Sequence, residues 1–413
     1  MKTHKSCKIS HTNHLNNLDV PLSSSKSESN RVLILNAFSK PQATIGNLSD
    51  ARDTRTMQRL LSSQEEILDV LDAGTTMRFL IAYHAISQSK VTLTGTERMQ
   101  QRPVKILADA LKVLGAEIEY LREPGYPPIL LKPFPGQKST ELEIRGDVSS
   151  QYISALLMIS PVLPSGLTIH LTGKIMSRPY IEMTLSLMAH YGIKYDWQGN
   201  TIRIEPQAYK ALDYTIESDW SGASYWFAMV ALAEKAEIKL LNLREKSLQG
   251  DKAIVEVMDQ LGVSGQFEED GIVLSKKEHK NNVDIDFSHC PDLAQTVAVT
   301  CAAKGIGGTF SGLESLRIKE TDRIAALQNE LAKIGAQLTE PAPGEWQLIP
   351  GTRSGKYENL TFETYEDHRM AMALAPLATL GNVTIEDPIV VEKSYPGFWS
   401  HMAMAGFKIE MQD

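Results

Sequence analysis

The feature that most constrains the fold is a local pattern that occurs five times along the chain. Each copy is an amphipathic helix pattern, then a glycine, then the apolar alternation that is typical of a half-buried strand. Successive glycines are 77, 70, 73 and 71 residues apart, at Gly115, Gly192, Gly262, Gly335 and Gly406. Near-constant spacing of this kind indicates a repeated structural unit.

The first copy shows the local chemistry of the pattern. Pro103 suits the first turn of a helix, and Gly115 can adopt the left-handed conformation that ends one. Ala116, Ile118 and Tyr120 then alternate as in a half-buried strand. The predicted apolar stripe of the helix consists of Ile106, Leu107, Ala110, Leu111 and Leu114.

One period further upstream, residues 53–72 have helical character but lack the glycine and the strand. We infer six units, of which the first is abbreviated. Six units divided over two domains give three units each, in a mixed α/β protein. No low-complexity linker separates the halves, and we place the boundary near residues 216–220.

Composition limits the classes of function. Lys and Arg number 42 against 50 Asp and Glu, so the net charge of −8 argues against a nucleic-acid or anionic-membrane surface. The three cysteines, Cys7, Cys290 and Cys301, lack metal-ligand spacing and indicate free thiols in a reducing compartment. The apolar run 225–233 is far shorter than the roughly 20 residues of a membrane span. We therefore expect a cytoplasmic protein that needs no metal or other cofactor.

Three segments of the first half place basic or hydroxyl side chains at a predicted helix start. Backbone N–H groups, hydroxyls and cations together bind phosphate and carboxylate. A solvated loop or a simple helix cap is the alternative for each segment taken alone. The segments are 23–31 with Lys26, Ser27 and Arg31, 72–80 with Gly74 and Arg78, and 95–103 with Arg98 and Arg102.

The sharpest signal lies at residues 316–327, where Lys319, Glu320 and Arg323 crowd the first turn of a predicted helix. Cations there oppose the helix dipole, although Glu320 and Asp322 could neutralise them as a solvated face. The apolar stripe of this helix is Ile324, Leu327, Leu331 and Ile334. For the other helix starts, a cap or a satisfied core residue is the alternative, although the three adjacent polar residues 149–151 exceed what a cap requires. These helix starts carry Ser149, Ser150 and Gln151, Ser177 and Tyr180, Asp292, and Asp367, His368 and Arg369.

The order of these motifs resembles one family. SKSxSNR, GTTMR, RMQQRP, SSQ, SRPY, PDLA, RIKETDR, EDHRMAM and KSYP occur in sequence and in rough spacing as in the 5-enolpyruvylshikimate-3-phosphate synthases, over about residues 7–408. The resemblance implies an α+β fold of two similar domains, each of three βαβαββ units, with the active site in the interdomain cleft. It assigns residues 23–217 to the N-terminal enolpyruvyl transferase domain, and residues 1–22 with 218–413 to the C-terminal one.

The resemblance also implies a reaction. The enolpyruvyl group of phosphoenolpyruvate is transferred to the 5-hydroxyl of shikimate 3-phosphate and phosphate is released, in the shikimate pathway to chorismate and aromatic amino acids. No nucleic acid or membrane takes part, and a monomer is expected. The implied catalytic residues are Asp292, Glu320, Lys26 and His368.

Substrate contacts are carried over in the same way. Those for shikimate 3-phosphate are Lys26, Ser27, Arg31, Ser149, Ser150, Gln151, Ser177, Tyr180, Asp292, Ser315 and Lys319. Those for phosphoenolpyruvate are Lys26, Asp72, Gly74, Arg102, Gln151, Arg323, Arg369 and Lys393. The two substrates together carry about six negative charges, which only a concentrated set of cations could hold side by side.

The sequence departs from the family pattern at two places, and two other functions are alternatives. Ser23 and Ser24 stand where the family usually has Pro-Gly, and Asp72 stands where it commonly has Asn. The rivals are the sister enolpyruvyl transferase that acts on UDP-N-acetylglucosamine, which commonly uses a loop cysteine, and a catalytically silent paralogue that only binds anions. Turnover with both substrates would distinguish them.

Overall fold

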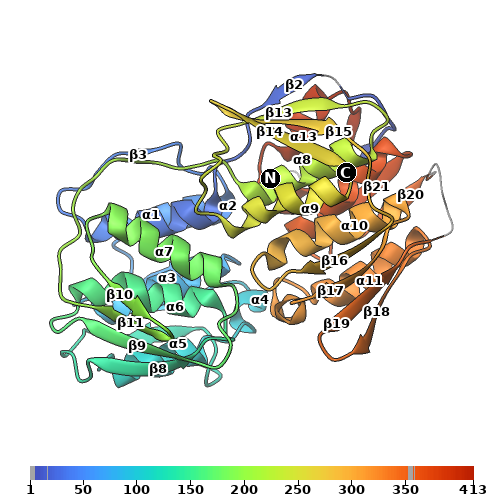
Figure 1. Cartoon of the computed structure of the whole chain (residues 1–413). Coiled ribbons are helices and arrows are strands. Elements are labelled where there is room, and N and C mark those ends of the chain that lie inside the picture. The colour runs from blue at the N-terminus through green and yellow to red at the C-terminus, as the bar shows by residue number, and fades with distance from the viewer. Residues whose placement is uncertain (1–4, 16, 352–356, 358) are drawn as a thin grey trace. The chain divides into compact units, whose positions relative to one another are not determined.

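The computed structural model describes residues 5–15, 17–351, 357 and 359–413 (Figure 1). The chain divides into two compact units. Unit A is Ser25–Ile216, and unit B is Met1–Ser24 together with Glu217–Asp413. The sequence predicts ranges of 23–217 and of 1–22 with 218–413, and the identity of each as an enolpyruvyl transferase domain stays a prediction.

One sheet pattern occurs five times. Two neighbouring strands are parallel, and two further strands pair antiparallel beside them; these two strands form a β-hairpin in four of the sheets, and in the fifth they are β1 and β22. In the sheet β16-β17-β19-β18, for example, Asn282 of β16 pairs with Gly307 of β17 in parallel, whereas β17 and β18 both pair antiparallel with β19. The other four sheets have the orders β4-β5-β7-β6, β10-β11-β9-β8, β14-β15-β13-β2 and β20-β21-β1-β22.

Unit A contains two of these sheets and a shorter first repeat, in which β3 and β12 form a two-stranded sheet. Its helices are α1 (Lys26–Phe38), α2 (Arg52–Leu61), α3 (Gly74–Ala85), α4 (Glu97–Gln100), α5 (Lys105–Val113), α6 (Ser150–Ile159) and α7 (Arg178–His190). Its strands are β3 (Ile45–Gly46), β4 (Ile67–Asp69), β5 (Val91–Thr94), β6 (Ile118–Tyr120), β7 (Ile129–Leu131), β8 (Glu141–Arg145), β9 (Leu167–Thr172), β10 (Asp196–Gln198), β11 (Thr201–Ile204) and β12 (Tyr214–Thr215).

Unit B contains the other three four-stranded sheets. Its α-helices are α8 (Trp220–Leu232), α9 (Ile254–Gln260), α10 (Ala294–Lys304), α11 (Arg323–Lys333), α12 (His368–Leu374) and α13 (Phe398–Met404). Short 3₁₀ turns include η2 (Gly250–Ala253), η3 (Pro291–Leu293), η4 (Glu314–Ile318) and η6 (Pro388–Lys393). The strands are β1 (Ser6–Ile9), β2 (Leu18–Val20), β13 (Glu237–Leu241), β14 (Val263–Glu268), β15 (Gly271–Lys276), β16 (Asn282–Asp286), β17 (Gly307–Ser311), β18 (Gln337–Ala342), β19 (Glu345–Ile349), β20 (Leu360–Phe362), β21 (Val383–Glu386) and β22 (Ile409–Gln412).

The predicted helix–glycine–strand repeat is confirmed. Helices α5, α7, α9, α11 and α13 each end within two residues of the predicted glycine. The φ angles of those glycines are all positive, at 109°, 84°, 95°, 82° and 107° from Gly115 to Gly406. A residue with a Cβ would be strained in this conformation, and at Gly115 the Cβ would also lie 2.4 Å from the carbonyl oxygen of Gly136.

Two details of the expected helices are wrong. Ile106 is 42% exposed, although Leu107, Leu111 and Leu114 are fully buried as expected. It is the second residue of α5 and points away from the buried stripe. Residues 53–72 are not one helical segment, because α2 ends at Leu61 and the strand β4 follows. The first repeat is abbreviated as predicted, but its missing part is the hairpin.

The N-terminal segment belongs to unit B. Strand β1 lies between β21 and β22, with Cys7 opposite both Ile385 and Met411. Strand β2 pairs in parallel with β13. The β1 strand therefore completes the last repeat, which the C-terminal part of the chain begins.

In each unit three inner helices form the centre of the core. Every residue of α8 and of α12 is buried, as are nine residues of α10. Helices α1, α3 and α6 are buried along most of their length in unit A. Most of these helices are apolar nearly all round, which is the pattern of a helix that packs on every side. The exception is α1, whose first two turns bury Glu28, Ser29, Asn30 and Arg31. The first turns of these helices are therefore the places where polar side chains of the inner layer gather.

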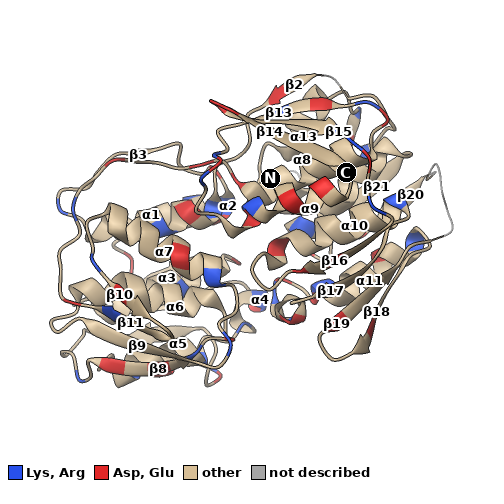
Figure 2. Cartoon of the chain, in the orientation of Figure 1, with Lys and Arg blue, Asp and Glu red and all other residues tan. Residues whose placement is uncertain are grey.

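Figure 2 shows acidic and basic residues interspersed along both units. Among the described residues, no helix combines the length and the apolar character that a membrane span requires.

Candidate active site

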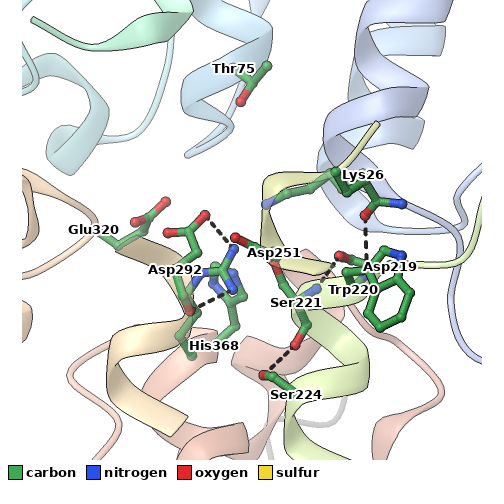
Figure 3. Close-up of polar contacts among 12 residues, drawn as sticks. Lys26, Thr75, Asp219, Trp220, Ser221, Ser224, Asp251, Asp292, Glu320 and His368 are labelled. Atoms are coloured by element: carbon green, nitrogen blue, oxygen red, sulfur yellow. Dashed lines mark hydrogen bonds and ion pairs between the residues drawn. The ribbon is translucent and has the colours of Figure 1, made fainter. Parts of the chain in front are cut away.

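The starts of α8, α10 and α12 are linked by polar contacts in unit B. Figure 3 shows Ser224 of α8, Asp292 of η3 and His368 of α12 from this region. Ser224 Oγ of α8 lies 3.2 Å from Thr296 Oγ1 of α10. Arg369 of α12 donates from Nη2 to Asp292 Oδ2 of η3 at 2.8 Å. The local folding explains this arrangement, because Pro291 opens η3 directly ahead of α10 and Asp367 caps α12 through the Arg369 backbone N–H.

Arg323 is the centre of this cluster. It is 2% exposed, and its guanidinium contacts three carboxylates: Asp367 Oδ2 at 2.7 Å, Glu320 Oε2 at 2.9 Å and Asp292 Oδ1 at 3.1 Å. Burial lowers its pKa, but the three carboxylates outweigh that effect and raise it. A cation at the first residue of α11 is therefore tolerated despite the helix dipole.

Asp292 accepts hydrogen bonds from Arg323 and Arg369. Burial would raise the pKa of Asp292, but the positive charges of Arg369, Lys319 and Arg323 dominate and hold it below its ordinary value. The side chain is therefore a carboxylate at neutral pH, and it is a weak proton acceptor as long as both guanidiniums remain beside it.

Lys319 and Glu320 precede α11, so their expected place in its first turn is wrong. Asp322 is the cap, because its side chain accepts from the backbone N–H groups of Ile324 and Ala325. Burial lowers the pKa of Lys319, while Asp292 and Glu320 act in the opposite direction. The other oxygen of Glu320 lies 3.7 Å from Lys393 Nζ, and Lys393 is 3% exposed.

The remaining predicted residues of unit B lie near this cluster in the sequence. His368 is the first residue of α12 and is buried, with Nδ1 at 3.7 Å from Asp367 Oδ1. Ser315 lies in the η4 turn, four residues ahead of Lys319. Unit B thus gathers Asp292, Lys319, Glu320, Arg323, His368, Arg369 and Lys393.

In unit A, Lys26 is the first residue of α1 and forms an ion pair of 3.1 Å with the buried carboxylate of Asp53. Arg31 follows on the same helix and is 2% exposed. Its guanidinium donates to Thr184 Oγ1 at 2.7 Å, to the Ser27 carbonyl at 2.9 Å and to Ser154 Oγ at 3.1 Å. Burial lowers the pKa of Arg31 to about 10. Arg31 therefore joins α1, α6 and α7, and its predicted contact with substrate stays a prediction.

A second group in unit A surrounds the start of α3. A Cβ on Gly74, the first residue of α3, would lie 2.8 Å from Nη1 and Nη2 of Arg102 and from Nη1 of Arg78. Arg78 donates to the Gly74 carbonyl at 2.9 Å. Gln151 Nε2 of α6 donates to Thr75 Oγ1 at 3.0 Å, so α3 and α6 begin side by side. Arg52 Nη2 donates to both carboxylate oxygens of Asp72, at 3.0 Å to each.

The serines predicted at helix starts fall into two kinds. Ser149 caps α6, since its hydroxyl accepts from the Gln151 backbone N–H, and Ser150 is buried as the next residue. Ser177 precedes α7 without capping it, and its φ of 51° is left-handed. Strain of this kind at a residue that carries a Cβ is typical of functional positions. Tyr180 lies on α7, and Arg98 lies on the short helix α4.

Sequence reasoning missed several polar partners. Asp53, Arg52 and Thr75 contact predicted site residues of unit A, and Asp251 belongs to the cluster of unit B. Asp367 was expected at a helix start and caps α12, but its contact with Arg323 was not foreseen, and Asp251 has no local pattern that marks it. In the described part of the chain, no group of three or more His, Cys, Asp or Glu side chains could hold a metal ion.

Comparison with known proteins decides the family. The family model described as EPSP synthase (3-phosphoshikimate 1-carboxyvinyltransferase) matches residues 58–402. The chain belongs to the EPSP synthase family. A 3-phosphoshikimate 1-carboxyvinyltransferase of Bacteroides fragilis (strain YCH46) is 47% identical over 399 residues, which cover 95% of this chain and 96% of that protein. The enzyme of the same name from Shewanella woodyi is 35% identical, over 93% of this chain and 96% of that protein.

Solved structures of EPSP synthases have the same fold. The EPSP synthase of Acinetobacter baumannii matches with a TM-score of 0.80 at 18% identity, over 98% of this chain and 99% of that one. Family membership agrees with the predicted two-domain fold of βαβαββ repeats.

Proposed function

We propose that this chain transfers the enolpyruvyl group of phosphoenolpyruvate to the 5-hydroxyl of shikimate 3-phosphate and releases phosphate. The observation that carries the proposal is the cluster of unit B, in which four cations lie around three carboxylates: Lys319, Arg323, Arg369 and Lys393 around Asp292, Glu320 and Asp367. Each substrate carries a carboxylate and a phosphate, and these four cations match that dense negative charge. Membership of the EPSP synthase family, whose relatives bear the name of this activity, supports the same conclusion.

The proposal assigns the residues to the two substrates. Phosphoenolpyruvate contacts Arg323, Arg369 and Lys393 of unit B and Lys26, Asp72, Gly74, Arg102 and Gln151 of unit A, with the negative charge of Asp72 offset by Arg52. Shikimate 3-phosphate is bound by Lys26, Ser27, Arg31, Ser149, Ser150, Gln151, Ser177 and Tyr180 of unit A and by Asp292, Ser315 and Lys319 of unit B. The side chains of Glu320 and Asp292 are 16% and 17% exposed, and this partial exposure supports direct contact of both with substrate.

The chemistry needs a proton donor and a proton acceptor. The 5-oxygen attacks C2 of phosphoenolpyruvate while C3 gains a proton, and then the C2–O bond to phosphate breaks as C3 loses a proton again. Asp292 accepts the proton of the 5-hydroxyl, Glu320 transfers the proton at C3, and Lys26 and His368 assist. An anion bound to Arg369 offsets the positive charge of the guanidinium beside Asp292. The pKa of the Asp292 carboxylate then rises toward the range of a general base.

A phosphate-release assay tests the function. Release should require both substrates and should stop when either is omitted. UDP-N-acetylglucosamine in place of shikimate 3-phosphate should give no release, and the opposite result would identify the sister transferase. Binding of both substrates without release would identify a silent paralogue and would refute the proposal.

We also propose that the protein acts as a monomer in the cytoplasm. The three cysteines are free and buried, which supports a reducing compartment. Light scattering coupled to size-exclusion chromatography would give the mass, and a value near 46 kDa is expected for one chain of 45.8 kDa.

A further inference from the structure

A buried carboxylic acid lies beside the Asp292–Arg369 pair. Asp251, in the η2 turn, is 4% exposed. One of its oxygens, Oδ2, accepts a hydrogen bond from the hydroxyl of Ser221, the second residue of α8. The other, Oδ1, is buried and has no hydrogen-bond partner among the described residues. Figure 3 shows the Asp251 carboxyl group directed toward the Asp292 side chain, with which it interacts electrostatically.

The charges around Asp251 do not favour a second carboxylate. Asp292 of η3 and Asp219, the cap of α8, both repel it, and Arg369 of α12 is the cation that attracts it. Cys290, ahead of η3, also faces it, but burial raises the pKa of that thiol to about 12, so it is neutral. Burial is the largest influence and, with Asp292, raises the pKa of Asp251 to about 7.

Arg369 already has a partner. Its Nη2 donates to Asp292 Oδ2 at 2.8 Å, and its Nη1 lies 3.4 Å from the Asp292 carbonyl oxygen. An ionised Asp251 would compete with Asp292 and with a bound anion for this one guanidinium. A protonated Asp251 does not compete, so the Arg369 guanidinium remains available to Asp292 and to a bound anion.

We propose that Asp251 is a positioning residue, which in its neutral form leaves Arg369 available to Asp292 and to phosphoenolpyruvate, and which draws the Arg369 guanidinium toward itself when it ionises. The inference rests on the proposed function, because it takes Arg369 as a phosphoenolpyruvate ligand. Asp251 touches no reacting atom and acts only through the position of Arg369. The enzyme then carries its own pH response near neutrality.

The test compares wild type with Asp251→Asn from pH 6 to pH 8.5. In wild type the KM for phosphoenolpyruvate should rise at least tenfold across this range, because with a pKa of about 7 the neutral fraction of Asp251 falls from about nine tenths at pH 6 to a few hundredths at pH 8.5. In Asp251→Asn the rise should disappear, since asparagine imitates the neutral acid. The ratio of the two KM values at each pH cancels the titration of the substrate itself.

A second variant separates this role from a purely structural one. Asp251→Ala keeps neither the shape nor the hydrogen-bond acceptor of the side chain and should lower kcat/KM about tenfold at pH 6, whereas Asp251→Asn should keep most of the wild-type value.

A matched variant checks the direction of the effect. The Ser221 hydrogen bond lowers the pKa of Asp251, so Ser221→Ala should move the midpoint of the KM rise to higher pH. The inference would be overturned if the ratio of the wild-type KM to the Asp251→Asn KM stayed constant with pH. It would also be overturned if the midpoint of the KM rise stayed at the same pH in Ser221→Ala. Failure of wild type to release phosphate would instead overturn the proposed function, so the two failures are distinguishable.

Discussion

Arg52 donates from Nη2 to both carboxylate oxygens of Asp72, at 3.0 Å to each. Asp72 stands two residues ahead of Gly74, where the resemblance leads us to expect Asn, and its negative charge would repel an anion at the start of α3. The Arg52 guanidinium neutralises that charge in place. The departure from the family pattern is therefore compensated inside unit A.

Loss of this compensation should weaken substrate binding. Arg52→Gln leaves the Asp72 charge without its guanidinium, and the KM for phosphoenolpyruvate should rise roughly five- to tenfold, the effect of about 1 kcal/mol of repulsion near a protein surface. Asp72→Asn added to Arg52→Gln should return the KM close to that of wild type. Steady-state kinetics of both single variants and the double variant measure the coupling. Simple additivity of the two effects would show that the pair does not act through charge.

Gly74→Ala should affect the same substrate by a steric route. The added Cβ would stand 2.8 Å from both terminal nitrogens of Arg102, so that guanidinium must move. We expect the KM for phosphoenolpyruvate to rise about tenfold while kcat falls by less, because a displaced ligand costs about one charge-assisted hydrogen bond. The dissociation constant of shikimate 3-phosphate alone, from calorimetry, is the control and should change little. An unchanged KM would contradict the assignment of Gly74 and Arg102 to phosphoenolpyruvate.

Glu320→Gln should separate chemistry from binding. The amide keeps the size of the side chain but cannot transfer the proton at C3, so turnover should fall by about 10² to 10⁴. Shikimate 3-phosphate should still bind within a few-fold of wild type. Lys319→Met should do the reverse, since it removes a charge that acts on the bound ground state. Single-turnover rates and equilibrium binding measure the two effects, and near-normal turnover of Glu320→Gln would refute the proton-transfer role.

Asp251 also predicts how stability depends on pH. Its pKa is raised from 3.8 to about 7 by burial, so the folded protein holds this proton more tightly than the unfolded chain. The resulting stabilisation is complete below about pH 4 and is lost as the pH rises toward 7. Asp251→Asn should therefore gain several degrees in melting temperature over wild type at pH 8, and much less at pH 5. Differential scanning calorimetry at both values measures this, and an equal difference at the two pH values would refute it.

The sequence predicts the fold well where the pattern is local. Gly115 and its four counterparts follow the ends of their helices as expected. This signal is local, because a glycine directly after an amphipathic pattern predicts the left-handed residue that ends a helix. Ile106 was misplaced because the helix begins later than Pro103 suggests, at Lys105. The first repeat lacks the hairpin and keeps only β3 and β12. The sequence indicates this, because residues 53–72 lack the glycine that follows the helix in the other repeats.

The candidate site was predictable only in part. Arg323 and Asp292 stand in motifs, so their residue types could be carried over, but their mutual 3.1 Å contact depends on packing between α10 and α11. Asp251 meets Ser221 across 30 residues of sequence, and nothing local marks either residue. Charge networks of this kind arise from long-range packing, which periodicity and spacing do not encode.

The place of β1 between β21 and β22 affects the order in which the chain can fold during synthesis. About 370 residues separate β1 from β21, so the strand leaves the ribosome long before either neighbour exists, and contacts at such separation form slowly. Unit A is contiguous and can assemble once Ile216 has emerged, whereas the last sheet of unit B waits for both partners of β1. A nascent chain with Ser6–Ile9 unpaired would expose an edge that can pair with other chains, and chaperones that bind extended segments would have this strand as a substrate for most of translation.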